Sequence, residues 1–470
     1  QPKLLSLPLI FQLKHYSVLL SHLSHFYSLA KTNSTTFPQN NSYPRATKPL
    51  RKYRRLINQR SSKCCIFKVP RILLRHNPKA YTPIAFSIGP FHYGEEHLRD
   101  TQNIKLKYLY DLVSRFVDQG TSTEKKLILM DLTEAMSEIW EEARECYAGP
   151  INMSKDEFVQ MLVLDGCFLI ELFYRSEEAN LTSNKDDPIF SVNTMIQVLH
   201  HDLILLENQI PWVVLACLYE LITKQVINQL PLDLLVLIFF NGTFSRKAGL
   251  LQHEDHMIQS ITDFMERKHK HILDLLRNSM VGVKKDNHNN NINWQQLPSA
   301  TILQEAGIKF KATTKASLLD IQFRKGVLEI PPLHIHETTE SLLRNLICFE
   351  QCLPNCKGKI TSYAILLDNL INTSKDMEIL CKRGVVDNWL NNEEATEFFN
   401  QLYNDTFVNY FHYSKLIVDV NEHCGHRWPK YRRVLMHDYF KHPWALTSVF
   451  AAAILLFLTF LQTLFTILYK

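Results

Sequence analysis

Acidic residues are missing from the first 94 positions of this 470-residue chain, and the first of them is Glu95. The same 94 positions carry fifteen Lys or Arg residues, whereas positions 95–424 carry 31 basic and 46 acidic residues. From Gly425 onward, six basic residues stand against Asp438 alone. We therefore predict an acidic body between two basic ends, and we expect residues 1–62 to form a basic, flexible leader.

The basic cluster between Arg51 and Arg60 lacks the recognition helix or zinc finger that usually carries nucleic-acid binding. Basic segments near a membrane anchor are instead attracted to anionic lipid headgroups, at about 1 kcal/mol per residue held near the surface. Nucleic-acid binding is therefore the weakest function that the charge pattern allows, and we predict no nucleic-acid partner.

Glycine is scarce, at 13 residues, and the motifs GxSxG, GxxxxGK followed by Ser or Thr, GxGxxG and HExxH are absent. These absences exclude the common nucleophile elbow, the common phosphate-binding loops and the zincin helix. His253 and His256 flank two acidic residues and could offer two metal ligands, but an exposed charged helix face explains this pattern better. We predict no metal site and no cofactor.

A hydrolase would need side chains for acid–base chemistry. The candidates for a hydrolase are His92, Asp165, Asp202 and Glu207. Each also has a structural explanation, because Asp165 could pair within a helical core and His92 lies in a turn rich in Pro and Gly. We assign no catalytic residue and keep a membrane-tethered hydrolase as the second interpretation.

Ten cysteines in a chain of this length are too sparse for the disulfide framework of a small secreted domain. Cys348, Cys352 and Cys356 recur at a spacing of four, but a proline interrupts their helix and no histidine follows at zinc-finger spacing. Cys64 and Cys65 are adjacent and cannot easily chelate one ion together. We expect most of the cysteines to be reduced and buried.

Charged residues are also absent from Trp444 to Tyr469, a run of 26 residues. As a helix this run would be about 39 Å long, which is enough to cross a hydrocarbon core of about 30 Å with some tilt. A buried core helix of this composition would need partners around its whole circumference. We therefore predict one transmembrane anchor at 443–470, with the ends of its span at Trp444 and Tyr469.

Small and polar residues recur along this run at alternating steps of three and four, which places them on one helix face. They are Ser448, Ala452, Leu455, Thr459, Gln462 and Thr466. Such a stripe permits a second helix to approach closely, so it predicts self-association or pairing with another membrane protein. In a solitary helix each Thr would instead bond to a carbonyl of the preceding turn, and both interpretations stay open.

The charges that flank the run predict its orientation. The basic residues that precede it are Arg427, Lys430, Arg432, Arg433 and Lys441, and only Lys470 follows it. Because the positive side of a span stays cytosolic, we predict a tail-anchored protein whose body faces the cytosol.

Two features keep a luminal or extracellular body open as the alternative. An apolar run from Leu4 to Leu13 follows Lys3, with Ser28 and Ala30 at signal-cleavage spacing. Seven glycosylation sequons occur, at Asn33, Asn40, Asn152, Asn180, Asn241, Asn372 and Asn404.

Residues 63–442 predict one large, mainly helical body, with a surface loop or subdomain break at 284–298. Helices are expected at 127–147, 158–174, 212–221, 338–350, 361–371, 373–382, 393–402 and 405–420. Ser154 and Glu157 form a capping-box pair before the second of these. Alternation at 318–323 and 326–330 predicts one small hairpin.

A polar triplet, Glu207-Asn208-Gln209, separates two apolar helices, and we interpret it as a cap for otherwise unpaired backbone groups. The triplet belongs to a set of short motifs spread along the chain. They are Phe67-Lys68-Val69-Pro70, Asn77-Pro78-Lys79-Ala80-Tyr81, Ser87-Ile88-Gly89-Pro90-Phe91-His92, Leu164-Asp165-Gly166-Cys167-Phe168, Leu205-Leu206-Glu207-Asn208-Gln209-Ile210-Pro211, Gly326-Val327-Leu328-Glu329-Ile330-Pro331 and Phe349-Glu350-Gln351.

With these motifs the chain resembles the plant family called domain of unknown function 247, over roughly Cys64 to Tyr469. The resemblance implies a plant source, a mainly helical body and a single C-terminal span, but no activity. Some grass members are tied to self-incompatibility, which favours a recognition role by analogy. We therefore predict a membrane-anchored, non-enzymatic interaction or signalling protein, whose partners are the lipid bilayer and an unidentified protein.

Overall fold

The computed structural model describes residues 63–115, 122–179, 187–224, 229–241, 268–282, 295–313, 317–408, 410–426 and 443–468. Some predicted features lie outside these residues. They are the leader at 1–62, the pair His253 and His256, positions 284–294 of the predicted break, the basic residues just before the anchor, and the span end at Tyr469.

Helices dominate the described residues, which confirms the predicted mainly α fold. The first of them are α3 (Arg71–Leu74), α4 (Gln102–Arg115), α5 (Ser122–Glu145), α6 (Lys155–Ala179), α7 (Asn193–Leu203), α8 (Trp212–Thr223), α9 (Leu232–Phe239) and α11 (Ile272–Val281). They are followed by α12 (Ala300–Glu305), α13 (Thr339–Cys352), α14 (Lys359–Leu370), α15 (Ser374–Lys382), α16 (Asn392–Gln401), α17 (Ser414–Gly425) and α19 (Pro443–Leu468).

The strands are short. They are β1 (Ile66–Phe67), β2 (Tyr147–Ala148), β3 (Lys309–Ala312), β4 (Gln322–Arg324), β5 (Val327–Ile330), β6 (Leu333–Ile335) and β7 (Val386–Asn388). Two 3₁₀ helices, η2 (Pro78–Tyr81) and η3 (Glu96–Leu98), lie between β1 and α4.

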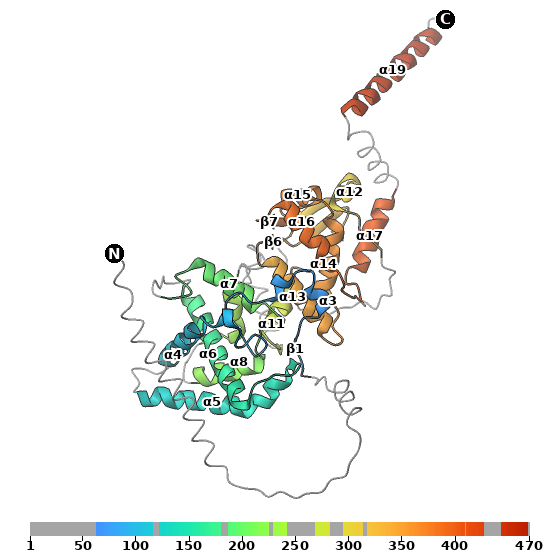
Figure 1. Cartoon of the computed structure of the whole chain (residues 1–470). Coiled ribbons are helices and arrows are strands. Elements are labelled where there is room, and N and C mark those ends of the chain that lie inside the picture. Colours follow the sequence, from blue (N-terminus) through green and yellow to red (C-terminus); the bar gives the residue numbers. More distant parts are fainter. Residues whose placement is uncertain are drawn as a thin grey trace, which may run out of the picture. The chain divides into compact units, whose positions relative to one another are not determined.

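The chain divides into two compact units, whose elements are labelled in Figure 1. The described residues of Gln1–Asn241 and Arg267–Leu276 belong to the first unit, and the described residues from Arg277 onward belong to the second.

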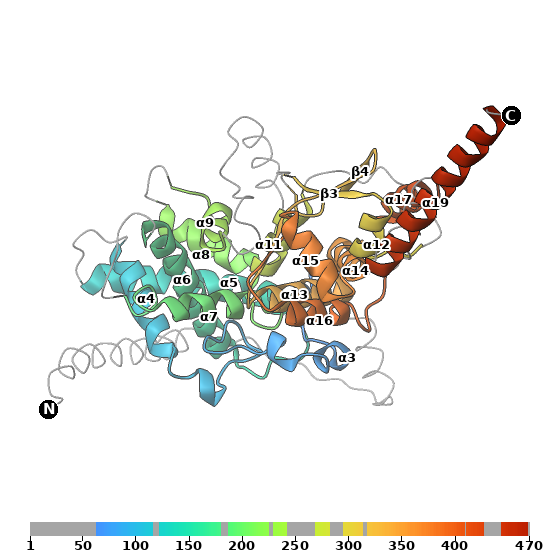
Figure 2. The same ribbon diagram turned by 90° about the horizontal axis from the view of Figure 1, so that it is seen from above.

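Helix α6 is the centre of the first unit, where it packs against α4, α5, α8 and α9 (Figure 2). Phe158, Phe168 and Leu172 are fully buried because α6 is apolar around most of its circumference and neighbours cover several of its sides. The predicted capping box is confirmed: the Ser154 amide donates to Glu157 Oε2 at 2.9 Å, and the Glu157 amide donates to Ser154 Oγ at 3.2 Å.

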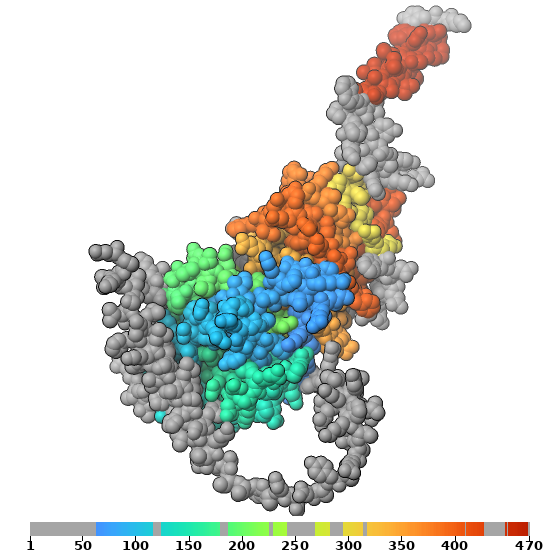
Figure 3. Space-filling view, in the orientation of Figure 1, coloured from blue at the N-terminus to red at the C-terminus, as the bar shows by residue number. Residues whose placement is uncertain are grey.

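A segment from Lys63 to Leu98 with only short elements, which are β1, α3, η2 and η3, precedes α4 in the first unit, and we call it the extended segment. Within it β1 pairs in parallel with β2, where Ile66 lies opposite Tyr147. The segment is blue in Figure 3, where it forms much of the visible face of this unit. Because a two-residue strand satisfies few backbone groups, most of the segment needs other hydrogen-bond partners.

The second unit contains the predicted hairpin, formed by the antiparallel strands β4 and β5. Lys325 and Gly326 turn the chain with φ values of 49° and 77°, the left-handed pair that a two-residue hairpin loop requires. The sheet also has a parallel neighbour on the other side of β5, strand β3, which the sequence does not predict.

In the second unit α15 packs against α12, α16 and β7, and α14 packs against α13 and α16. The helix predicted at 405–420 is wrong at its start, because α17 begins at Ser414. Asp405 has a φ of 59°, and this left-handed conformation cannot belong to a right-handed helix.

Helix α19 contains one stretch that is long and apolar enough to cross a membrane, from Phe450 to Leu468. The stretch has 19 residues with a mean hydropathy of 2.2, and none of it is buried against other described residues.

Candidate functional site

Asp202 lies at the end of α7 and holds the backbone of the extended segment. Its carboxylate accepts hydrogen bonds from the amides of Ile84 at 2.7 Å, Ala85 at 2.8 Å and Phe86 at 2.8 Å. His201 Nδ1 lies 3.0 Å from the same carboxylate. Since Asp202 is fully buried, its charge is balanced by these donors rather than by water.

The triplet after α7 also bonds to backbone groups, and Gln209 caps the end of α7 as predicted, whereas Glu207 and Asn208 bond to the extended segment. Glu207 Oε1 accepts from the Val69 amide at 2.6 Å, and Asn208 Oδ1 accepts from the Ile88 amide at 2.6 Å. The Gln209 amide group donates to the carbonyls of Leu203 at 2.7 Å and Leu205 at 2.9 Å, where α7 ends. The bond to Leu203 satisfies a carbonyl of the last turn of α7, and the Leu205 carbonyl also accepts from the Asn208 amide at 3.1 Å.

Asp165 on α6 forms the third attachment. Its Oδ2 accepts from the Gly89 amide at 2.8 Å, and its Oδ1 accepts from Lys105 Nζ at 2.6 Å. Lys105 also donates to the Ser87 carbonyl, and both charged residues are buried. Burial raises the pKa of the Asp165 carboxyl, while the Lys105 ammonium and the Gly89 amide oppose that rise.

We name the side chains of Asp165, Asp202, Glu207 and Asn208 the clasp, because all four accept hydrogen bonds from amides between Val69 and Gly89. The clasp joins four of the motifs, at 67–70, 87–92, 164–168 and 205–211, which are far apart in the sequence. Gly89 is required at this junction, since its φ is 78° and an added Cβ would lie 2.4 Å from the Gln209 carbonyl oxygen.

His92 is the candidate that the clasp does not use. Its Nδ1 lies 2.7 Å from Glu95 Oε1, while its buried Nε2 has no hydrogen-bond partner among the residues that the structure describes and lies 3.9 Å from Glu207 Oε2. A carboxylate that orients an imidazole is one part of a hydrolytic site. The His92 ring, however, has no hydroxyl or thiol bonded to it among the described residues.

The structure thus brings the four hydrolase candidates to one segment, but it gives three of them a role in holding backbone amides. Lys105, the cationic partner of Asp165, is not predicted from the sequence. One signal was available, because Lys105 shares a face of α4 with the buried residues Tyr108, Leu109 and Leu112.

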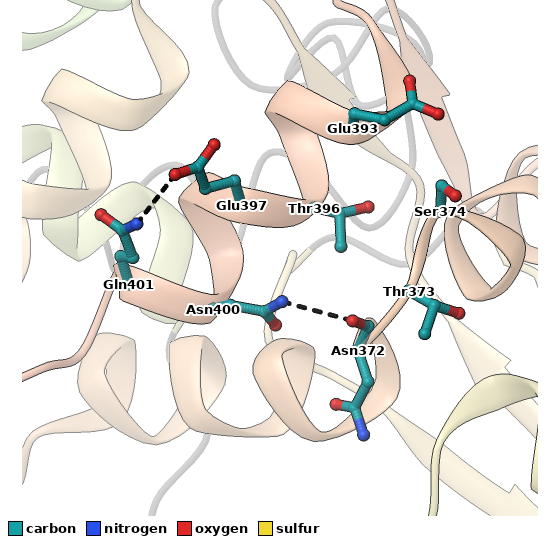
Figure 4. Close-up of a pocket in the computed structure, with 8 residues that line it drawn as sticks. All are labelled: Asn372, Thr373, Ser374, Glu393, Thr396, Glu397, Asn400 and Gln401. Atoms are coloured by element: carbon teal, nitrogen blue, oxygen red, sulfur yellow. Dashed lines mark hydrogen bonds between the residues drawn. The ribbon is translucent and has the colours of Figure 1, made fainter.

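A shallow polar pocket of about 340 Å³ lies in the second unit, open to solvent. Its lining residues are Asn372, Thr373, Ser374, Glu393, Thr396, Glu397, Asn400 and Gln401 (Figure 4). Asn400 Nδ2 donates to the Asn372 carbonyl at 3.3 Å, and the side-chain amide of Asn372 points away from Asn400. Ligand sites are usually lined mainly by hydrophobic and aromatic residues with a few convergent polar groups, whereas all the residues that line this pocket are polar or charged.

Metal ligands do not gather in the part of the chain that the structure describes: no group of three His, Cys, Asp or Glu side chains is placed to hold an ion. Cys348 is buried in α13, which ends at Cys352, so the spacing of four is not continued along one helix to Cys356.

The predicted association stripe lies on α19, where Ser448, Ala452, Thr459, Gln462 and Thr466 are exposed. The Thr459 hydroxyl donates to the Leu455 carbonyl and the Thr466 hydroxyl donates to the Gln462 carbonyl, each at 2.7 Å. These are the bonds that a solitary helix would form, and association through the stripe stays a prediction.

The described residues define a mainly helical protein with two compact units and one apolar helix long enough to cross a membrane. Residues 66–458 match the model of the DUF247 family, described as plant protein of unknown function, and the chain belongs to this family. This confirms the predicted resemblance.

Two relatives from Arabidopsis thaliana are similar to this chain over most of their length. UPF0481 protein At3g47200 is 29% identical over 434 residues, covering 86% of this chain and 86% of the relative. Putative UPF0481 protein At3g02645 is 23% identical over 491 residues, covering 84% of this chain and 89% of the relative. No solved structure matches the chain.

Proposed function

We propose that this protein is a tail-anchored, single-pass membrane protein that acts without catalysis, by binding another protein in recognition or signalling. The observation that carries the proposal is the Phe450–Leu468 stretch of α19, whose large apolar side chains are exposed. Exposed apolar surface of this extent is unfavourable in water and favourable in a bilayer. Self-association through the stripe on α19 belongs to the same proposal.

Cysteine chemistry and flanking charge support a body in the cytosol. All ten cysteines lie among the described residues and none is in a disulfide, as is usual for a reducing compartment. The basic residues before the span favour the same side.

Membrane extraction tests the anchor. Full-length protein expressed in plant cells should stay in the membrane pellet after carbonate treatment, and a variant that ends at Gly425 should move to the supernatant. Release of the full-length protein by carbonate would contradict the proposal.

Glycosylation tests the orientation. Asn152, Asn241, Asn372 and Asn404 are exposed, so a luminal body would offer accessible sequons to the glycosylation machinery. A cytosolic body should show no change in mobility after deglycosylation. A shift that the replacement of these four asparagines by Gln removes would instead establish the luminal orientation.

The hydrolase alternative rests on the oriented imidazole of His92. His92→Gln should leave partner capture by proximity labelling unchanged, and Glu96→Gln on the exposed surface serves as the control. Loss of biological complementation by His92→Gln, with an unchanged melting temperature and unchanged partner capture, would favour the hydrolase.

A further inference from the structure

Cys65 and Cys146 face each other in the first unit, one position before the β1–β2 pair. Because Ile66 lies opposite Tyr147 in this parallel pair, the same register places Cys65 opposite Cys146. The Cys65 amide donates to the Cys146 carbonyl at 2.8 Å, and the Cys146 thiol donates to the Glu142 carbonyl at 3.4 Å. Neighbouring strands lie about 4.8 Å apart, which falls within the Cα separations of about 4.4–6.8 Å that disulfides span.

The surroundings make the two thiols unequal. The hydrogen bond from Cys65 lowers the pKa of Cys146, and the cations of Lys63 and Lys270 act in the same direction, whereas burial and the nearby Glu142 carboxylate oppose the shift. The same bond and burial raise the pKa of Cys65. Cys146 is therefore the better nucleophile, and Cys65 is placed to attack the oxidised Cys146 sulfur and form a disulfide with it.

We propose that Cys65 and Cys146 are a redox modification site, at which a hydroperoxide converts two facing thiols into one disulfide. The Cys146 sulfur attacks one peroxide oxygen, the O–O bond breaks, and the other oxygen leaves as water or alcohol while Cys146 becomes a sulfenic acid. The Cys65 sulfur then attacks this sulfur, the S–O bond breaks, and water leaves with the thiol proton. Two electrons pass from the two sulfurs to the peroxide.

The disulfide would fix the start of the extended segment to the chain that follows α5. The neighbouring Cys64 is the internal competitor, because it is also buried and precedes Cys65 directly. The parallel register places Cys65 opposite Cys146, so we expect Cys65 and not Cys64 to form the disulfide with Cys146.

Purified full-length protein in detergent micelles, titrated with hydrogen peroxide, tests the site. Maleimide labelling should show the loss of two thiols together, and mass spectrometry should find a cross-linked peptide pair that contains Cys65 and Cys146. Cys64→Ser should keep the cross-link, as should Cys167→Ser, which removes a fully buried thiol of α6. In Cys65→Ser, Cys146 should instead proceed to the sulfinic acid.

Two results would overturn the proposal. One is oxidation of Cys146 to the sulfinic acid in the wild-type chain while Cys65 keeps its thiol. The other is a cross-link to Cys146 through Cys64, or one that survives in Cys65→Ser. Dithiothreitol should restore both thiols in every sample in which the disulfide has formed.

Discussion

Replacing Asp202 by alanine should release the extended segment from the first unit. The substitution removes the acceptor of three backbone amides, those of Ile84, Ala85 and Phe86, and leaves them without that partner. The bond to Phe86 is buried, and the other two are partly buried. A buried unpaired donor costs about 1–3 kcal/mol, and donors that water can reach cost less. We expect a total loss of about 3 kcal/mol in the free energy of opening this segment.

Hydrogen exchange measured by mass spectrometry reports the free energy of opening for each peptide of the segment. A loss of about 3 kcal/mol corresponds to exchange roughly 100-fold faster in peptides that cover Ile84–Gly89. Asp202→Asn should give a smaller acceleration, because its amide oxygen still accepts while its NH₂ group opposes an N–H donor.

Asp131→Ala is the matched control, because Asp131 is exposed on α5 and should leave exchange in this segment unchanged. If Asp202→Ala accelerates the segment by less than about threefold, side-chain carboxylates do not hold it. The function assigned to the clasp would then be refuted.

Three further outcomes are expected. Burial raises the pKa of Asp233 to about 6, so the stability linked to its protonated form is present below about pH 4 and is lost as the pH rises through 6. Asp233→Asn should therefore stabilise the protein by about 1 kcal/mol at pH 7.5. This figure allows for solvent screening and for the favourable position of the Asp233 carboxylate in the first turn of α9. At pH 4.5 the thermal unfolding of the variant should differ little from that of the wild-type chain. Gly326→Ala should cost about 1–2 kcal/mol in denaturant unfolding, because φ is 77° and the added Cβ would lie 3.2 Å from His423 Nε2, whereas Gly425→Ala meets open space and should be neutral. Replacing both Thr459 and Gln462 by Leu should weaken chemical cross-linking between anchors in detergent. An unchanged cross-linking ladder would contradict self-association through the stripe.

Local signals predict much of this fold. The capping box at Ser154 and the apolar run of α6 identify a core helix, since both depend on residues within one turn or one helix. The hairpin at Lys325 and Gly326 is predicted for the same reason. The parallel strand β3 is not, because its partner β5 lies across an intervening loop and strand, and its four residues carry no distinctive pattern.

The candidate site is predicted in part. Asp165, Asp202 and Glu207 stand out as acidic residues in apolar surroundings, but their partners are backbone amides that a sequence cannot single out. Lys105 shows the same difficulty, since only the fold brings it to Asp165 from 60 positions away.

The clasp also constrains the order in which the first unit is completed during synthesis. Gly89 is bonded to a carboxylate 76 positions later, and Val69 to one 138 positions later. A nascent chain that ends before Glu207 therefore lacks the carboxylate that accepts the hydrogen bond of the Val69 amide. The amide of Val69 must stay bonded to water until Glu207 has been synthesised. Protease resistance near Val69 should therefore appear only after α7 and the triplet that follows it have left the ribosome.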